Sequence, residues 1–560
     1  MVALDSKPVR CMVYLLTAAV LIAFVAACTS SPSPAAVEVT RVVEKQVTTV
    51  VEKQVTTVVE KQVTTVVEKQ VAVTVTPTPI PQGGTLRVGV RGNPTSLDPH
   101  KNTSSFDRPI LYAIYDRLVD IDQNLRFVPQ AADKWEVSED GKAITFTLHP
   151  GITFSDGTPL DAEAVKFNLD RVRAKETASP FAPEFATVES VEVVDDLTVR
   201  INLKEPTPGL FSSLAERGGL LVSPKAAKDL GDELARQPVG SGPYQLVEWL
   251  QDDHVTLKRT PNYWREGLPH LDRLEFHIIP DENVKVTNLK AGSLDIIDTV
   301  PPKDVSSIRN NPALDYSTTT GLSTWQLVMN MSRSPFDNHD VREAMALAID
   351  RSAILGSLFF GIGQPAYSML PPSSWAYDPE AYTVRDRDVG KAKELLAQAG
   401  YPDGFEFSVL VINQPIRVQM VTALQSQLAD VGVKATVDAK EVAQYASELR
   451  AGEYDAVLLW WAGRVDPDGT LYAWFHPNGI WDKYGYDNPE VTRLLQEART
   501  TIDLDTRKAL YGQAQALIDK DVPMVFLVHD EEGKAHSKKL TNFVPNPDGV
   551  MRFTEVWLTP

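Results

Sequence analysis

The fold of this chain is decided by residues 405–460, which read FEFSVLVINQPIRVQMVTALQSQLADVGVKATVDAKEVAQYASELRAGEYDAVLLW. Short apolar runs alternate here with longer segments in which apolar residues recur at helical spacing. Regular alternation of strand and helix is the signature of a compact α/β lobe. The pattern predicts strands at 405–411, 433–437 and 454–460, and helices at 417–430 and 441–451.

The part of the chain that precedes this lobe is richer in strands. Alternating apolar residues predict strands at 85–90 and 144–149. Residues 158–161 (TPLD) match a capping box with proline at the first helical position, and they predict a helix that starts there. The regular α/β alternation begins only beyond about residue 320. The sequence therefore predicts a body of at least two lobes.

Motifs for catalysis or cofactor binding are missing from the sequence. It contains no GxxxxGK[ST], HExxH, CxxC or GxSxG motif, and its 9 histidines are scattered. Residues 120–124 begin like a calcium loop, but Leu125 stands where the sharp turn needs glycine. Because a catalytic triad can be assembled from distant residues, these absences weaken the case for an enzyme without excluding one. We expect no catalysis, no metal and no cofactor.

The N-terminus has the parts of a secretory signal: basic residues, an apolar run at 12–27 and small residues before Cys28. The apolar run is short for a membrane span. A cysteine directly after the small residues resembles the lipobox of bacterial lipoproteins, in which the sulfur is lipidated. The resemblance implies a signal peptide at 1–27 and an acylated Cys28, the alternative being an incidental or buried thiol. Cys11 would leave with the signal, so the mature chain would hold no disulfide.

Residues 28–82 are interpreted as a spacer that follows the lipidated cysteine. The octad VEKQVTTV occurs three times from residue 43, and VEKQVAVT follows at 67–74. Eight residues fit neither the heptad nor the 11-residue repeat of regular supercoils. The proline-rich residues 76–81 favour extended polyproline II. A short oligomerising coiled coil is the alternative interpretation.

The formal net charge of −19 limits the possible partners of the protein. An acidic surface argues against nucleic acid and against direct contact with anionic lipid. After residue 28 no run is long and apolar enough to cross a bilayer. The lipid would therefore be the only membrane anchor.

Short motifs recur in a fixed order over residues 83–560. They are PTSLDP (94–99), AIYDRL (113–118), AADKW (131–135), FSDGTPL (154–160), VGSGPY (239–244), PNYW (261–264), AGSLD (291–295), FD (336–337), VREA (341–344), YD (454–455), Trp461 and DPD (466–468). Together they resemble the family 5 extracellular solute-binding proteins, the dipeptide and oligopeptide receptors of ABC importers. The match is specific for the family and weak for the ligand.

The resemblance implies an α/β, two-lobed periplasmic-binding-protein fold of the class II type, cluster C, with an extra subdomain in the first lobe. In the family, the C-terminus returns to the first lobe. The implied boundaries are 83–320 for lobe I with the subdomain at about 130–220, 321–528 for lobe II, and 529–560 for the return to lobe I.

Four segments match those that line the family's cleft: 102–106, 240–244, 323–330 and 460–468. The last has a physical argument of its own, because two tryptophans end an apolar strand and open α/β sheets bind ligands at that end. Since side chains alternate along a strand, one of Trp460 and Trp461 faces the core, and we expect Trp461 to face the cleft. Trp325 either touches the ligand or packs in the core. The candidate ligand-binding residues are Thr103, Ser104, Ser105, Tyr244, Trp325, Trp461, Arg464 and Asp466.

Arg464 departs from the peptide-binding members, in which an aspartate at this place pairs with the α-ammonium of the peptide. A buried arginine would repel an ammonium and favour a carboxylate, a phosphate or a hydroxyl-rich ligand. Two alternatives stay open. Arg464 could pair with Asp466 or Asp468 and brace the loop, or Asp466 could take the amine-binding role.

The resemblance implies a monomeric, lipid-anchored receptor in the cell envelope, on the outer face of the cytoplasmic membrane. It would deliver a peptide, an oligosaccharide or another polar solute to the permease subunits of an ABC importer by hinge closure. One alternative is a ligand sensor for a transmembrane signalling partner. The other is a surface hydrolase, which would turn its substrate over, whereas a receptor would return its ligand unchanged.

Overall fold

The computed structural model describes residues 80–102, 104 and 106–560, which belong to one compact unit. The predicted signal peptide, Cys28 and the octads of the spacer lie outside the described residues, as do Thr103 and Ser105. Within the described part, no helix is both long and apolar enough to cross a membrane.

Lobe II contains the α/β alternation predicted from residues 405–460. Strand β14 (Glu406–Ile412) pairs in parallel with β15 (Lys434–Lys440) and with β16 (Ala456–Trp461). Helices α10 (Pro415–Ala429) and α11 (Val442–Ala451) connect these strands, so each predicted element is confirmed within a few residues. The other helices of this lobe are α7 (His339–Ala348), α8 (Arg351–Leu358), α9 (Val389–Gln398), α12 (Asp468–Phe475), α13 (Pro489–Thr500) and α14 (Leu504–Asp521).

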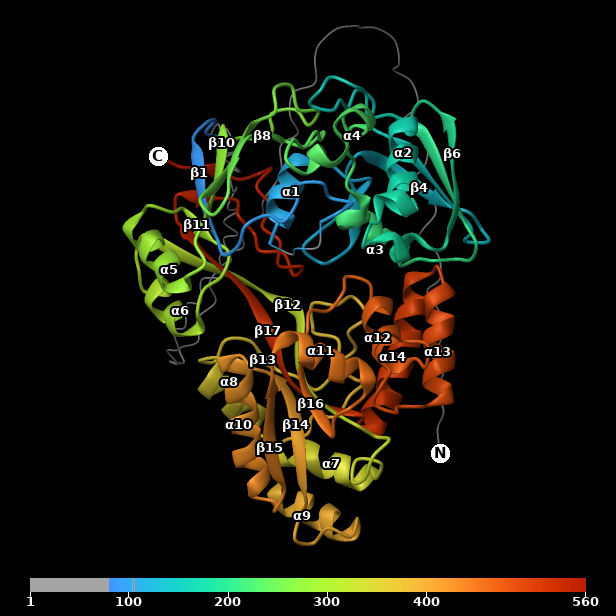
Figure 1. Ribbon diagram of the computed structural model, residues 1–560, viewed down its shortest axis with the longest axis vertical. Helices are drawn as coiled ribbons and strands as arrows, with labels where there is room; N and C mark the ends of the chain where they lie inside the picture. Colours follow the sequence, from blue (N-terminus) through green and yellow to red (C-terminus); the bar gives the residue numbers. More distant parts are fainter. Residues whose placement is uncertain (1–79, 103, 105) are drawn as a thin grey trace, which may run out of the picture. The chain divides into compact units, whose positions relative to one another are not determined.

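One sheet of 11 strands runs through both lobes in the order β15-β14-β16-β12-β17-β11-β1-β10-β9-β8, with β13 (Gln364–Pro365) paired to β17. Strands β12 (Leu314–Met329) and β17 (Met524–Ser537) are antiparallel and run diagonally from one lobe to the other (Figure 1). The C-terminal half of β12 borders β16, whereas the C-terminal end of β17 borders β11. Their register is interrupted between Thr320 and Thr324, beside the crossing expected near residue 320.

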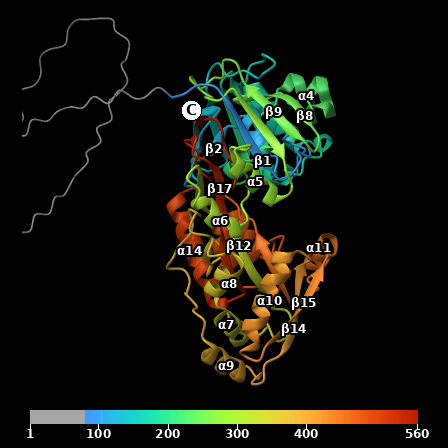
Figure 2. The same cartoon turned by 90° about the vertical axis from the view of Figure 1, so that its left-hand side faces the viewer.

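Lobe I is built around β1, which pairs in parallel with both β10 and β11. The apolar side chains of these strands pack against α1 and against C-terminal residues such as Phe553, so the chain end returns to this core. Figure 2 shows β12 and β17 along the middle of the unit, with α10 beside β14 and β15. The elements of lobe I outside the subdomain are β1 (Thr85–Val90), α1 (Arg108–Ile114), β2 (Val119–Ile121), β3 (Phe127–Pro129), α4 (Pro224–Leu230), β8 (Tyr244–Leu250), β9 (His254–Arg259), β10 (Arg273–Ile278), α5 (Glu282–Ala291), β11 (Ile296–Ile297), α6 (Pro302–Arg309), β18 (Leu540–Thr541) and β19 (Trp557–Leu558).

A four-stranded antiparallel sheet of order β4-β5-β7-β6 forms the core of a subdomain in lobe I. Val465 of lobe II and Leu322 of β12 also pack in this core, so the subdomain touches lobe II directly. The elements of the subdomain are β4 (Ala132–Val137), β5 (Ala143–Leu148), α2 (Ala162–Arg173), η1 (Lys175–Thr177), η2 (Ala182–Phe185), β6 (Val188–Asp195), β7 (Thr198–Leu203), α3 (Leu210–Ala215) and η3 (Arg217–Gly219), where η denotes a 3₁₀ helix; η4 (Gly231–Ala235) follows α4.

Helix α2 begins at Ala162, later than the capping box at 158–161 predicts. The cap is the side chain of Asp161, which accepts a hydrogen bond from the Ala164 nitrogen at 2.9 Å. The backbone around Pro159 pairs instead with the preceding segment, where the Leu160 nitrogen donates to the Ile152 carbonyl. The expectation of a helix start at Pro159 is therefore wrong, because a local β-bridge captures these residues first.

Candidate functional site

The predicted loop at 102–106 meets the guanidinium of Arg217, the first residue of η3. Nη1 of Arg217 donates to the carbonyl oxygen of Ser104 at 2.9 Å and lies 3.4 Å from Oδ1 of Asn102. Ser104 is half-buried, and its hydroxyl accepts a hydrogen bond from the Phe106 nitrogen. Of the three predicted hydroxyl ligands in this loop, Ser104 is the one that the structure describes.

Arg217 has contacts on several sides, but it forms no ion pair with an acid among the described residues. Its guanidinium carbon lies 4.9 Å from the ring centre of Phe181, and its Nε is buried without a hydrogen-bond partner. Burial lowers the pKa of this guanidinium. Among the residues that the structure describes, none places a carboxylate oxygen within 4.0 Å of its nitrogens. Arg217 therefore keeps donor capacity toward a ligand.

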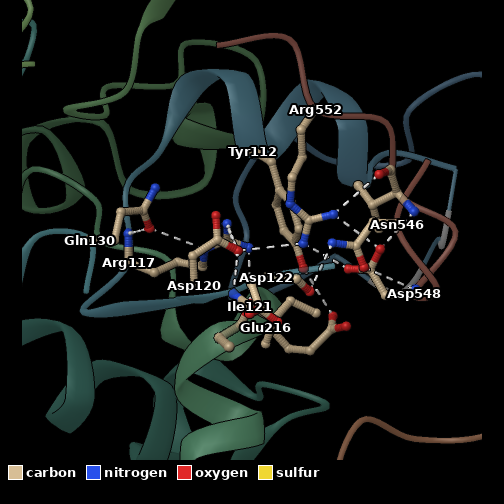
Figure 3. A network of polar contacts seen from close by, with 12 residues as sticks. Tyr112, Arg117, Asp120, Ile121, Asp122, Gln130, Glu216, Asn546, Asp548 and Arg552 are labelled. Carbon is tan, nitrogen blue, oxygen red and sulfur yellow. Dashed lines mark hydrogen bonds and ion pairs between the residues drawn. The ribbon is translucent and has the colours of Figure 1, made fainter. Parts of the chain in front are cut away.

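Glu216, the neighbour of Arg217, by contrast has a partner for each of its two carboxylate oxygens. Its carboxylate lies 3.2 Å from Nη1 of Arg108 and accepts a hydrogen bond of 3.2 Å from the hydroxyl of Tyr112. The Tyr112 ring lies between the guanidiniums of Arg117 and Arg552, at 4.0 and 5.6 Å from its centre. This network ties α1 to the C-terminal segment and fixes the wall that carries Arg217. It continues through the pairs Arg117–Asp120, Arg552–Asp120 and Arg552–Asp548 (Figure 3).

Glu184 of η2 lies near cations from both lobes. Desolvation by the surrounding protein raises the pKa of its carboxyl group. A hydrogen bond from Ser213 and the positive charges of Arg464 and Arg217 act in the opposite direction. Because Arg464 belongs to lobe II and Arg217 to lobe I, one carboxylate marks the place where the charges of the two lobes come together.

Arg464 is exposed in the loop that follows β16. The turn into this loop needs Gly463, whose φ is +59° and whose missing Cβ would lie 2.1 Å from the carbonyl oxygen of Leu322. Nη1 of Arg464 donates to the Gly463 carbonyl at 2.7 Å, and its guanidinium carbon lies 5.0 Å from the ring centre of Trp461. Arg464 forms no ion pair with Asp466 or Asp468, so it does not brace the loop through either acid.

Asp466 is held by a different arginine. Arg507 of α14 donates to its two carboxylate oxygens at 2.9 and 3.1 Å, and both side chains are buried. The backbone nitrogen of Asp466 donates to Oγ of Ser212 at 3.2 Å, which joins lobe II to α3 of lobe I. Binding an amine through Asp466 would require this pair to open.

The two tryptophans of β16 have the opposite orientation to the one expected. Trp461 is 8% exposed, packs edge-on against Trp474 and Trp481, and donates through Nε1 to Thr470 at 3.2 Å. Trp460 is 37% exposed. The expectation that Trp461 faces the cleft is therefore wrong, because α12 and the loop behind it cover the Trp461 face of the sheet.

Asp530 of β17 joins the exposed tryptophan to Trp325. One of its carboxylate oxygens accepts from Nε1 of Trp325 at 2.8 Å, and the other accepts from Nε1 of Trp460. Trp325 is 6% exposed and packs in the core of lobe II, with the guanidinium of Arg417 at 5.5 Å from its ring centre. Burial raises the pKa of Asp530 to about 6, although both indole hydrogen bonds oppose that shift.

Tyr244 lies inside the core of lobe I. It is 1% exposed, and its hydroxyl is 3.4 Å from the carbonyl oxygen of Phe553. Burial raises the pKa of this phenol. In this conformation Tyr244 offers no surface to a ligand.

Three residues of this region escaped the sequence reasoning: Glu184, Arg217 and Asp530. A weak signal for Arg217 existed, since Gly218-Gly219 follow it and a Cβ at Gly219 would lie 2.1 Å from the Leu214 carbonyl, as in a tight turn. Guanidiniums, a partly exposed indole and carboxylates in one region can bind a polar solute with charges of both signs. No cluster of three His, Cys, Asp or Glu side chains suited to a metal occurs among the described residues.

Comparison with known proteins places these features in context. The family model "Bacterial extracellular solute-binding proteins, family 5 Middle" matches residues 126–482. The glutathione-binding protein GsiB of Pectobacterium atrosepticum is 34% identical over 479 residues, which cover 83% of this chain and 92% of that protein. The protein of the same name from Salmonella typhimurium is 33% identical over 482 residues, 84% of this chain and 93% of its own length.

Two solved structures share the fold over their whole length. HbpA2 from Haemophilus parasuis is 28% identical with a TM-score of 0.79, covering 85% of this chain and 100% of its own. The periplasmic binding protein DppA from Helicobacter pylori, in complex with the peptide STSA, is 26% identical with a TM-score of 0.72, covering 86% and 99%. The expected two-lobed periplasmic-binding-protein fold is thereby confirmed.

Proposed function

Because this chain belongs to family 5 of the bacterial extracellular solute-binding proteins, we propose that it is the receptor of an ABC importer for a small, charged, peptide-like solute. The receptor binds the solute outside the cytoplasm, closes over it and delivers it unchanged to the permease subunits.

The hinge of this receptor is the strand pair β12–β17. The register break between Thr320 and Thr324 lies where the two strands pass from one lobe to the other, and such irregular positions absorb changes in backbone dihedrals. A solute shifts the hinge toward the closed state only if it binds that state more tightly, which requires contacts with both lobes. Arg217 and Arg464 stand on opposite lobes and meet this requirement.

One observation supports the choice of ligand class: the loop of Arg464 meets α3, which precedes Arg217, through the Asp466–Ser212 hydrogen bond of 3.2 Å, so that cations from both lobes act on the Glu184 carboxylate. A short peptide carries an ammonium and at least one carboxylate and so complements such an array, whereas a neutral oligosaccharide leaves the charges uncompensated. The names of relatives that bind glutathione or a peptide support the same class. A peptide is therefore favoured over an oligosaccharide.

The proposed ligand contacts differ from those expected from the sequence alone. Ser104 and Arg464 remain in the set, and Trp460 takes the place of Trp461 as the aromatic surface. Trp325 and Asp466 support the site from inside lobe II, since both side chains are buried and held by Asp530 and Arg507. Thr103 and Ser105 also belong to the proposed set of ligand contacts, because they lie in the segment 102–106 that matches the family's cleft.

Cys28 anchors the protein to the outer face of the cytoplasmic membrane through acyl chains, and residues 29–82 form the spacer. The lipobox-like sequence before Cys28 supports this proposal. The cysteine content supports it as well, because the other cysteine of the sequence, Cys11, lies within the signal and leaves Cys28 without a disulfide partner. Two or more acyl chains give stable membrane attachment.

The experiment that tests the function is titration calorimetry of the detergent-solubilised, full-length protein with glutathione, alanylalanine, tetra-alanine and maltotriose. We expect saturable binding of one molecule of at least one peptide probe, recovery of that probe intact, and no heat from maltotriose. Saturable binding of maltotriose alone, or hydrolysis of a bound peptide, would overturn the proposal. Loss of uptake of the same labelled peptide in cells lacking this chain then tests its role in import.

A further inference from the structure

We infer that Arg217 of lobe I and Arg464 of lobe II form a carboxylate subsite that is shared by the two lobes and selects the ligand. The inference rests on the proposed function and goes further, because it assigns one chemical group of the ligand to two named residues. The ligand carboxylate that binds this subsite comes from the C-terminus of a peptide or from an acidic side chain, and the experiment below separates these two sources.

The surroundings of Arg217 favour the binding of an anion. Its guanidinium is partly desolvated, lies against the Phe181 ring and is tethered on one side by the Ser104 carbonyl. Its Nε is buried and makes no hydrogen bond. Because the guanidinium is partly desolvated, a carboxylate that accepts from its remaining N–H donors gains more there than at the surface.

Arg464 supplies the second guanidinium from the other lobe. Its guanidinium donates to the Gly463 carbonyl and lies 5.0 Å from the centre of the Trp461 ring. Neither acid of its own loop pairs with it: Asp466 is bound by Arg507, and one oxygen of Asp468 lies 3.5 Å from Nε of Arg499, while the other is buried without a hydrogen-bond partner. Arg464 thus adds positive charge that its own loop does not compensate.

A hydrogen bond between the lobes brings the segments of the two arginines together. The Asp466 nitrogen, two residues after Arg464, donates at 3.2 Å to Oγ of Ser212, which lies on α3 shortly before Arg217. The positive charges of both arginines also act on the pKa of Glu184, although none of their nitrogens lies within 4.0 Å of its oxygens. Nearby, Glu216 is already paired with Arg108.

The local charge then favours one further anion. Two guanidiniums and the Glu184 carboxylate leave an excess of one positive charge, which a single ligand carboxylate neutralises. Because the planar guanidinium matches a carboxylate with two parallel hydrogen bonds, arginine on each lobe gives geometric selection as well as attraction. A carboxylate that bridges both residues also favours the closed state over the open one.

The test combines changes in the protein with changes in the ligand. Titration calorimetry uses the full-length protein with glutathione, with its C-terminal amide, and with the analogue that lacks the α-carboxylate of the γ-glutamyl residue. The protein variants are Arg464→Gln and Arg217→Gln, with Arg493→Gln on the exposed face of α13 as the matched control. Arg464 is exposed, so its variant keeps the test valid if Arg217→Gln fails to fold.

We expect each of the two variants to bind glutathione about 10- to 100-fold more weakly, the range of a lost charge-assisted hydrogen bond. One of the two analogues should bind the parent protein about 10- to 100-fold more weakly than glutathione does. The same analogue should bind Arg464→Gln no more weakly than it binds the parent. The group that this analogue lacks is then the carboxylate that contacts Arg464. Arg493→Gln will bind like the parent.

Each contrary result has a separate meaning. If the parent binds glutathione and both analogues equally well, or if Arg464→Gln loses the same factor for all three ligands, the carboxylate subsite is overturned and the receptor function stands. If the parent binds another peptide probe but not glutathione, that peptide and its C-terminal amide are compared instead, and equal binding of the two overturns the subsite. If the parent binds no peptide probe, the proposed function fails and this inference fails with it.

Discussion

Arg507 holds Asp466 through two hydrogen bonds of 2.9 and 3.1 Å, and both side chains are almost completely buried between α14 and the loop after β16. The acid that could have bound the amine of a peptide is thus part of the frame of lobe II. The charge that this loop turns outward is Arg464.

Asp466→Ala should destabilise the protein strongly, because it leaves the Arg507 guanidinium buried without its partner. Removal of one member of a buried pair costs about 3–5 kcal/mol. The measurement is urea unfolding followed by circular dichroism. The matched control is Glu490→Ala, which removes an exposed partner of Arg493 and should leave the unfolding midpoint unchanged. Equal midpoints for the two variants would show that the Asp466–Arg507 pair contributes little to the fold.

The neighbouring tryptophans of β16 offer a matched pair of substitutions on one strand. Trp461→Ala should lower the free energy of unfolding by about 3–5 kcal/mol, because it opens a cavity beside the stacked rings of Trp474 and Trp481. Trp460→Ala should lower it by less, about 1–2 kcal/mol for the lost hydrogen bond to Asp530, but should weaken binding of a peptide probe by about tenfold, or about 1.4 kcal/mol. Unfolding curves and calorimetry check both halves.

Trp460 and Trp461 also mark how far the sequence could predict the site. Alternation along the strand correctly required one tryptophan inside and one outside. It could not tell which, because the answer depends on α12 and residues 474–481, which cover one face of the sheet from another part of the chain. If Trp460→Ala proved to be the more destabilising change, the assignment of the two faces would be reversed.

The fold was more predictable than the site for a physical reason. Strands and helices such as β14 and α10 are encoded locally, in the spacing of apolar residues along a short segment. Glu184, Arg217 and Arg464, by contrast, come from three distant segments, and each alone looks like an ordinary surface charge. Only the packing of α3 against the loop after β16, through Ser212 and Asp466, brings them together.

Asp530 should make stability depend on pH between about 4 and 6. Burial raises its pKa to about 6 in the folded state, above the value of about 3.9 expected for the unfolded chain. Between these values the folded state binds more protons, so stability from this group is greatest below pH 4, declines as the pH rises to about 6, and stays constant above that.

The check compares Asp530→Asn with the parent, because other buried carboxyl groups titrate in both proteins. Over this window the parent should lose about 1–3 kcal/mol relative to the variant, and the difference should then stay constant. Thermal unfolding midpoints from pH 4 to pH 8 measure it. Parallel pH profiles for the two proteins would mean that the indole hydrogen bonds from Trp325 and Trp460 keep Asp530 ionised throughout.

Cys28→Ser should abolish acylation of the protein, because the acyl chains need the cysteine sulfur as their attachment point. Cells grown with radiolabelled palmitate should incorporate label into the parent and into the Cys11→Ser control, since Cys11 lies within the signal that is removed. Replacing residues 1–28 with a conventional cleavable signal should further release the protein in soluble form, as no other membrane anchor is expected. Label retained in Cys28→Ser would place the modification elsewhere, and a protein that stays membrane-bound without residues 1–28 would point to a second anchor.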